Sequence, residues 1–119
     1  MNQIILVGRL AKDPEITETE EGKKFSSITL AVQRPFKNID GIYDTDFITC
    51  SLWNAIAENT TEYCKKGDVI GVKGRLQTNS FEDKEGNKKF SMDVIAEKIT
   101  FLSSRTNNMS DKDMEHEDR

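Results

Sequence analysis

The order of strand-like and helix-like segments constrains the fold of this chain more than any other feature of its sequence. Apolar side chains recur at every second position in most of the strand-like segments, which is the period of a β-strand. Five such segments occur in chain order: QIILVGRL (3–10), SITLAVQR (27–34), DFITCSLW (46–53), DVIGVKGRLQT (68–78) and FSMDVIAEKITFL (90–102). Two polar stretches between them are predicted as loops, PFKNIDGIYDT (35–45) and NSFEDKEGNKK (79–89), and Glu85-Gly86-Asn87 predicts a hairpin in the second.

The segment NAIAENTTEYCKKG (54–67) is predicted as a helix. Asn54 is suited to cap its amino end, and Gly67 is suited to the left-handed position that follows a helix. Lys65 and Lys66 would lie at the carboxyl end of the helix dipole, which favours cations. Four residues share one side at helical spacing: Ile56, Thr60, Tyr63 and Cys64.

Three strands, a helix and two further strands are the pattern of an OB-fold. We therefore predict an all-β protein, a five-stranded OB-fold Greek-key barrel with one α-helix between strands 3 and 4. A helix of this length could plug one end of the barrel. Periodicity alone leaves a small α+β sandwich as the alternative. Residues 1–104 are predicted to form this single domain, and residues 105–119 a short flexible acidic C-terminal tail.

The two faces of each predicted strand separate core positions from outward ones. Both faces of 3–10 are apolar, which predicts that another subunit covers its outer face. Near Glu97 and Lys98 the alternating apolar side chains change from even-numbered to odd-numbered positions, which predicts a β-bulge. The inward positions predicted for the other strands are Ile28, Leu30, Val32, Ile48, Cys50, Leu52, Ile70, Val72, Leu76, Phe90, Met92, Val94 and Ala96.

Composition argues against several classes of function. The net charge is −4 and the pI is near 5.1, so overall charge does not hold nucleic acid to this chain. Cys50 and Cys64 match no zinc or redox spacing and are interpreted as a core residue and a helix residue; the single histidine, His116, lies in the tail. No metal, cofactor or catalytic cluster is predicted, and the chain is not expected to be an enzyme. Without a long apolar run or a signal peptide, it is expected to be cytoplasmic and to have no membrane span.

Four aromatic residues occupy positions that a core does not need. Phe47 and Trp53 lie on the outward face of 46–53, while Phe36 and Phe81 lie in the two predicted loops. In an OB barrel the surface of strands 2 and 3 and the connecting loops line one groove, which would bring all four together. Unpaired bases stack on such rings without sequence preference. The residues predicted to contact phosphates are Arg9, Arg34, Lys37, Lys73, Arg75, Lys84, Lys88 and Lys89.

Five segments of the chain resemble the bacterial and phage single-stranded DNA-binding proteins. They are ILVGRLAKDPE (5–15), SITLAVQR (27–34), DFITCSLW (46–53), AENTTEYCKKGDVIGVKGRLQT (57–78) and SFEDKEG (80–86). The resemblance extends from residue 1 to about residue 102, and it implies an OB barrel that assembles as a homotetramer through its first strand. It also implies that bases stack on Phe36, Phe47, Trp53 and Phe81, three of which are phenylalanine where some family members carry tryptophan.

The C-terminus departs from that family pattern. Family members carry a long flexible linker that ends in acidic residues and a short hydrophobic tip, whereas this chain ends SSRTNNMSDKDMEHEDR. The tail is acidic, but it is short and has no apolar tip, so recruitment of repair or replication enzymes is not expected to carry over. The departure favours a phage, plasmid or accessory version of such a protein over the main cellular one.

We therefore expect a non-enzymatic protein that binds and protects single-stranded DNA, without sequence preference, in DNA replication, recombination and repair. One alternative is a replication-restart or protein-interaction module that uses the same aromatic face. Others are an RNA-binding, cold-shock-like module and an oligosaccharide-binding OB domain. For Phe47 and Trp53 themselves, the alternative is burial at a subunit contact or beneath a loop.

Overall fold

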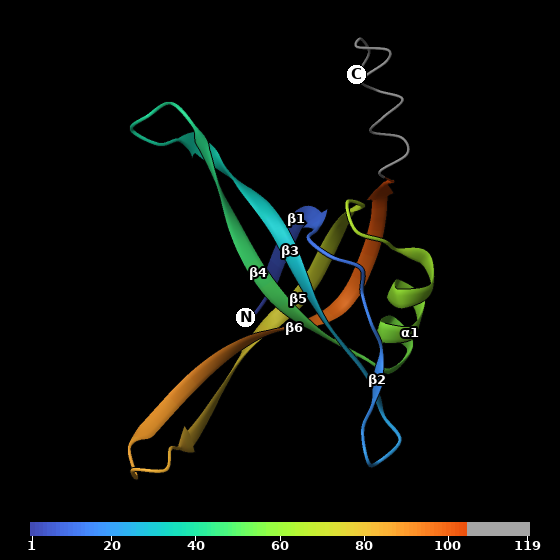
Figure 1. Cartoon of the computed structure of the whole chain (residues 1–119), viewed down its shortest axis with the longest axis vertical. Helices are drawn as coiled ribbons and strands as arrows, with labels where there is room; N and C mark the ends of the chain where they lie inside the picture. The colour runs from blue at the N-terminus through green and yellow to red at the C-terminus, as the bar shows by residue number, and fades with distance from the viewer. Residues whose placement is uncertain (105–119) are drawn as a thin grey trace.

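The computed structural model describes residues 1–104, which form a closed β-barrel with one helix (Figure 1). The strands are β1 (Ile4–Leu10), β2 (Thr17–Glu18), β3 (Lys24–Lys37), β4 (Tyr43–Trp53), β5 (Val69–Glu82) and β6 (Lys88–Ser103), and the helix is α1 (Asn54–Tyr63). Apart from the two-residue β2, the order of elements is the predicted one, and the OB-fold prediction is confirmed. The predicted tail, residues 105–119, lies outside the described residues.

The barrel closes because β1 pairs on both of its edges. Hydrogen-bonded neighbours follow the order β1-β5-β6-β4-β3, and β1 pairs with β3 as well as with β5. All of these pairings are antiparallel except the short parallel contact between β4 and β6. α1 packs against β3, β4 and β6. None of the helical structure within residues 1–104 has the length and apolar character of a transmembrane segment.

Two long hairpins extend beyond the barrel. We call residues 34–45 the β3–β4 arm and residues 77–92 the β5–β6 arm; in Figure 1 both project to the left, one upward and one downward, while α1 lies at the right. The loop predictions for these stretches were wrong in extent, because β3 continues to Lys37 and β5 to Glu82. Strand pairing persists there although neither side of the arms is buried. The predicted hairpin at Glu85-Gly86-Asn87 is confirmed, with Gly86 at φ +83°.

The core lies inside the barrel and under α1. Its members are Leu10, Ile28, Leu30, Cys50, Leu52, Ala57, Cys64, Ile70, Val72, Val94 and Ala96. Three predicted core residues were wrong, since Leu76, Phe90 and Met92 are exposed. By pairing they share the inward side with Val94, but they lie in or beside the β5–β6 arm, where no element of the described residues covers them.

The predicted β-bulge is confirmed, and a glycine lies opposite it. Lys73 pairs with Lys98 and Gly74 with Ala96, which leaves Glu97 as the extra residue. A Cβ added to Gly74 would lie 2.2 Å from the backbone oxygen of Ile95, so the strands approach too closely for a side chain. Where β1 crosses β3, Gly8 is under the same constraint from the backbone of Ala31.

The ends of α1 differ from the prediction. Asn54 is not the cap: Trp53 occupies that position without a side-chain hydrogen bond, and Asn54 has φ +56°. The helix stops at Tyr63, because the backbone N–H groups of Lys65 and Lys66 donate to the carboxylates of Asp68 and Asp13 at 2.8 and 2.7 Å.

The turn that follows α1 accounts for the other differences. Gly67 is left-handed as predicted, at φ +92°, but in this turn rather than directly after the helix, and its N–H donates to the carbonyl of Leu10. Tyr63 is exposed, whereas Ala57 and Thr60 are the buried residues of the helix. The early stop therefore ties the end of α1 to β1 through backbone contacts.

Candidate nucleic-acid interface

The outer face of β3 and β4 carries the aromatic residues that sequence periodicity singled out. Along these paired strands the odd-numbered side chains point away from the core: Phe47 lies opposite Ala31, and Trp53 lies opposite Phe25. Phe47 is 67% exposed and Trp53 is 38% exposed. The predicted outward orientation of both residues is therefore confirmed for the chain by itself.

Trp53 packs against a second ring that the sequence reasoning missed. The ring centroids of Phe25 and Trp53 are 4.6 Å apart, with the planes tilted by 49°. Such a pair restricts the indole while part of it stays open to solvent. Phe25 extends the alternation of β3 two residues toward the amino end from Ser27, and this signal was available once β3 was known to begin at Lys24.

Phe81 shares the sheet face of Phe47 and Trp53, although it comes from the other arm. Ser51 of β4 pairs with Ile95 of β6, and from there the outward positions of β5 and β6 alternate to Phe81, which lies opposite Lys89. Phe81 is 52% exposed. One continuous sheet surface thus connects the three rings.

Phe36 is exposed in the β3–β4 arm, but strand pairing does not assign it to a face. The pairing is irregular between Gln33 and Lys37, so the alternation of side chains is interrupted there. The structure therefore brings Phe47, Trp53 and Phe81 onto one surface and places Phe36 near the tip of one arm.

Several of the predicted phosphate contacts already have partners. Arg34 donates from Nη2 to Asp46 Oδ1 at 2.9 Å and lies 3.7 Å from Asp44, both on the core side of the arm by alternation. This hydrogen bond lowers the pKa of the Asp46 carboxyl below its ordinary value and raises the pKa of the Arg34 guanidinium. To bind a phosphate, Arg34 would first have to release these two carboxylates. Its ion pairs therefore favour a role in stabilising the arm.

The remaining cations differ in how strongly they are engaged. The Arg75 Nε atom lies 3.6 Å from Glu97 Oε2, and the Lys89 Nζ atom lies 4.0 Å from Asp83 Oδ2. Lys37 and Lys88 lie over the rings of Tyr43 and Phe90 at 5.8 and 5.9 Å from their centroids. Lys73 is exposed on the outer face of β5, and Lys84 is exposed in the turn of the β5–β6 arm.

Arg9 lies in the same cross-strand row as Phe47. Arg9 pairs with Ala31, which in turn pairs with Phe47, and the Arg9 side chain donates to the Gly67 carbonyl at 2.9 Å. A cavity of about 340 Å³ lies along this row and is lined by Val7, Gly8, Arg9, Ala31, Gln33, Thr45 and Val69. Arg9 and Ala31, the cross-strand neighbour of Phe47, therefore line one hollow on the outer surface.

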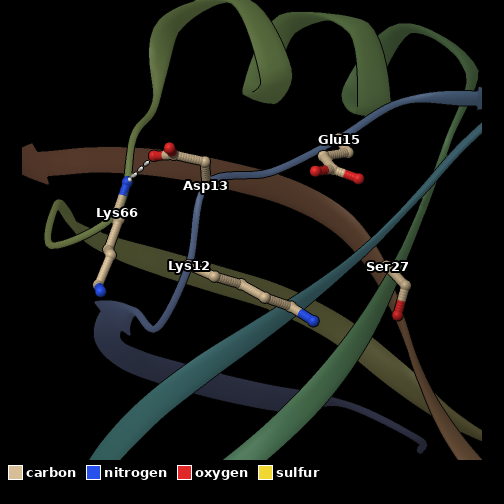
Figure 2. A pocket seen from close by; sticks show the side chains of 5 residues that line it. All are labelled: Lys12, Asp13, Glu15, Ser27 and Lys66. Atoms are coloured by element: carbon tan, nitrogen blue, oxygen red, sulfur yellow. Dashed lines mark hydrogen bonds between the residues drawn. The ribbon is translucent and has the colours of Figure 1, made fainter.

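A second cavity, of about 360 Å³, lies beside the amino-terminal part of β3 (Figure 2). Figure 2 shows the Lys12 side chain extending toward Ser27, an outward residue of β3, while the Asp13 carboxylate accepts a hydrogen bond from the backbone of Lys66. Glu15 also lines the cavity, so its charge is mixed. Lys12 and Lys66 are cations near the aromatic face that the sequence reasoning left out.

Neither cysteine is placed to act as a nucleophile. Burial raises the pKa of the Cys50 thiol to about 11, and burial also raises the pKa of Cys64. Both side chains are buried and free of disulfides, which agrees with the structural roles predicted for them. Within residues 1–104 no group of three or more His, Cys, Asp or Glu side chains is arranged to hold a metal ion.

An OB barrel with exposed rings and cations on one sheet face and two projecting arms defines the class of single-strand nucleic-acid-binding proteins. Residues 1–102 match the "Single-strand binding protein family", and the chain therefore belongs to this family. The resemblance predicted from the sequence is confirmed, and single-strand binding is the function of the chain. No comparison supports the protein-interaction alternative.

The named relatives agree with this assignment. The chain is 44% identical over 104 residues to single-stranded DNA-binding protein B of Bacillus subtilis, covering 87% of this chain and 92% of that protein. It is 45% identical over 107 residues to single-stranded DNA-binding protein 3 of Listeria innocua, covering 90% and 67%. It is 46% identical over 105 residues to the single-stranded DNA-binding protein of Halalkalibacterium halodurans, covering 88% and 62%.

Proposed function

We propose that this chain coats single-stranded DNA by laying the strand across the outer face of β3, β4, β6 and β5. Bases stack on Phe47, Trp53 and Phe81, with Phe36 contributing from the β3–β4 arm. The observation that carries the proposal is the placement of three exposed rings on one continuous sheet surface. No catalytic step is part of this function.

Stacking accounts for both strength and lack of sequence preference. Each stacked base contributes roughly 1–3 kcal/mol, so four rings contribute on the order of 8 kcal/mol before the cost of ordering the strand. Every base has a π-face, and therefore the rings accept any sequence. Duplex DNA, whose bases are already stacked, gains nothing from these rings.

Phosphate contacts require a local excess of cations rather than a positive chain. Lys37 and Lys73 are exposed on the aromatic face, and Arg9 lies in the row of Phe47. Lys88 is exposed in the β5–β6 arm, on the side of Phe90. On single strands each neutralised phosphate contributes about −0.7 to the slope of log K against log salt. Salt-dependent binding by a protein of net charge −4 follows from this arrangement.

The proposed biological role is protection of single strands exposed during DNA replication, recombination and repair, in the cytoplasm. Sequence-independent stacking suits this role, because exposed strands have every sequence. Arg75, Lys84 and Lys89 are proposed as further phosphate contacts from β5 and the β5–β6 arm. Arg34 is proposed as a phosphate contact only after release from Asp46 and Asp44.

A titration with fluorescence anisotropy tests this function. A labelled oligo-dT strand is titrated with the full chain at two salt concentrations, with unlabelled duplex as competitor. We expect tight, salt-sensitive binding that the duplex does not displace. Absence of binding at micromolar protein would overturn the proposal, and equal or better competition by an RNA oligomer of matching sequence would favour the RNA-binding alternative, since RNA adds 2′-hydroxyls.

We further propose that the functional unit is a homotetramer whose dimer contact runs through residues 3–10. Ile5 and Val7 are 67% and 53% exposed on the outer face of β1. Val7 pairs with Gly71, and a Cβ on Gly71 would be 3.8 Å from Leu102, which is also half exposed. Two apolar side chains of β1 and one of β6 thus form one patch across Gly71 of β5, and such patches mark protein contacts.

Val7→Lys is expected to lower the assembly mass, because it places a charge in the centre of this patch. Sedimentation velocity measures the mass directly, and Ile39→Lys, a change at a fully exposed isoleucine on the β3–β4 arm, is the matched control. An unchanged mass for Val7→Lys would show that assembly uses another surface.

A further inference from the structure

Tyr43 lies on the aromatic face although it belongs to none of the predicted stacking positions. It is the first residue of β4 and pairs with Lys37. Positions 43, 45 and 47 alternate to the same side, so Tyr43 shares the outer face of Phe47, four residues away. Its side chain is 44% exposed. Sequence periodicity missed it because residues 35–45 were predicted as a loop.

A cation accompanies this ring. The Lys37 Nζ atom lies 5.8 Å from the centroid of the Tyr43 ring. A nucleotide presents a flat base and an anionic phosphate, and a paired ring and ammonium offer one partner to each. Thr45, which lies between Tyr43 and Phe47 on this face, lines the 340 Å³ cavity together with Arg9, so the surface beside this row is hollowed.

The arm that carries Tyr43 is internally braced. The Asn38 side-chain oxygen accepts hydrogen bonds from the backbone N–H groups of Asp40 and Ile42 at 2.9 and 3.0 Å. The Asn38 amide donates to Asp44 at 3.1 Å, and Arg34 is bound to Asp46 on the core side of the arm. The turn and the strand around Tyr43 are therefore preorganised, which reduces the ordering cost of binding.

We propose that Tyr43 and Lys37 form an additional nucleotide-binding subsite, in which a base stacks on the tyrosine ring and the lysine binds an adjacent phosphate. The subsite extends the row of Trp53 and Phe47 toward the tip of the β3–β4 arm, about 13 Å beyond Phe47 at the rise of an extended strand. This inference rests on the proposed function, because it extends the same DNA path.

Tyr43→Ala is expected to weaken binding of a long oligo-dT strand by about fivefold or more, the lower end of the stacking range. Tyr43→Phe should retain wild-type affinity, because the ring and not the hydroxyl makes the contact. Tyr63→Ala removes the other tyrosine, which is 69% exposed on α1, and should leave affinity unchanged. Lys37→Gln should lower the salt slope by about 0.7.

A second readout avoids the possibility that Tyr43→Ala perturbs the fold. In a Trp53→Phe background, tyrosine is the emitting side chain, and oligo-dT should quench it. Adding Tyr43→Phe should abolish this quenching, whereas adding Tyr63→Phe should preserve it. Quenching that survives Tyr43→Phe would overturn the subsite.

The outcomes separate this inference from the function on which it rests. Wild-type affinity in Tyr43→Ala, together with weakened binding in Phe47→Ala, would overturn the Tyr43 subsite and leave single-strand binding intact. Equal losses in Tyr43→Ala and Tyr43→Phe would overturn stacking at this position. Absence of binding by the unmodified chain would overturn the proposed function itself.

Discussion

Replacing both Phe47 and Trp53 with alanine is expected to weaken binding of oligo-dT by roughly 2–6 kcal/mol, because each ring contributes about 1–3 kcal/mol of stacking. In affinity this is a loss of about thirtyfold or more. Anisotropy titration at one fixed salt concentration measures it. Neither ring belongs to the buried core, so the barrel should remain folded.

The control for this double variant is Phe90→Ala. Phe90 is 72% exposed and also lies near a lysine, but strand pairing places it on the opposite sheet face. Its removal should leave most of the affinity intact. A loss as large as that of the double variant would mean that the strand follows the other face. Because Trp53 packs on Phe25, the thermal midpoint of each variant is measured alongside.

Gly74→Ala is expected to destabilise the barrel by about 3 kcal/mol, at the upper end of the usual cost of overpacking. The new methyl group would lie 2.2 Å from the backbone oxygen of Ile95, and backbone cannot move aside as a flexible side chain can. Urea unfolding measures the change, and the thermal midpoint should fall by roughly 10 °C or more.

Gly71→Ala is the matched control on the same strand. A Cβ at Gly71 would meet its nearest neighbours at 3.8 Å, which is ordinary van der Waals contact. Both variants are compared at one protein concentration, because assembly contributes to apparent stability. If the free energy of unfolding of Gly74→Ala were within 1 kcal/mol of that of the unmodified chain, β5 and β6 could not approach as closely as described.

Sequence periodicity predicted the barrel well, because burial of one side of each strand imposes this periodicity on the sequence. Ile28, Leu30, Cys50 and Leu52 alternate with polar residues, since each strand has one side in the core and one outside. Even the bulge at Glu97 was visible, because an extra residue reverses the phase of the apolar side chains.

The arms could not be predicted in the same way. Residues 34–45 and 77–92 pair as strands without burying a side, so their composition resembles that of loops. The alternation that correctly assigned Leu76, Phe90 and Met92 to one side did not indicate whether anything covers that side. Periodicity indicates which side of a strand a residue faces, whereas burial depends on which distant elements pack against that side.

The same distinction separates the site residues that the sequence predicted from those that it missed. Phe47 and Trp53 were found because they break the pattern of an otherwise polar face, and Phe81 and Phe36 because they stand in polar surroundings. Phe25 and Tyr43 were missed, because both lie outside the predicted strands, and their cross-strand partners, Trp53 and Lys37, follow only from the observed pairing. The ion pairs of Arg34 likewise depend on which arm residues share a side.

The arms contain no member of the buried core, and this separation has an evolutionary consequence. A substitution within residues 34–45 or 77–92 changes what the protein touches without changing what holds the barrel together. Ligand preference can therefore drift, or be selected, under little constraint from foldability. Diversity among relatives of this protein should accumulate in the two arms, while the glycine crossings and barrel interior stay fixed.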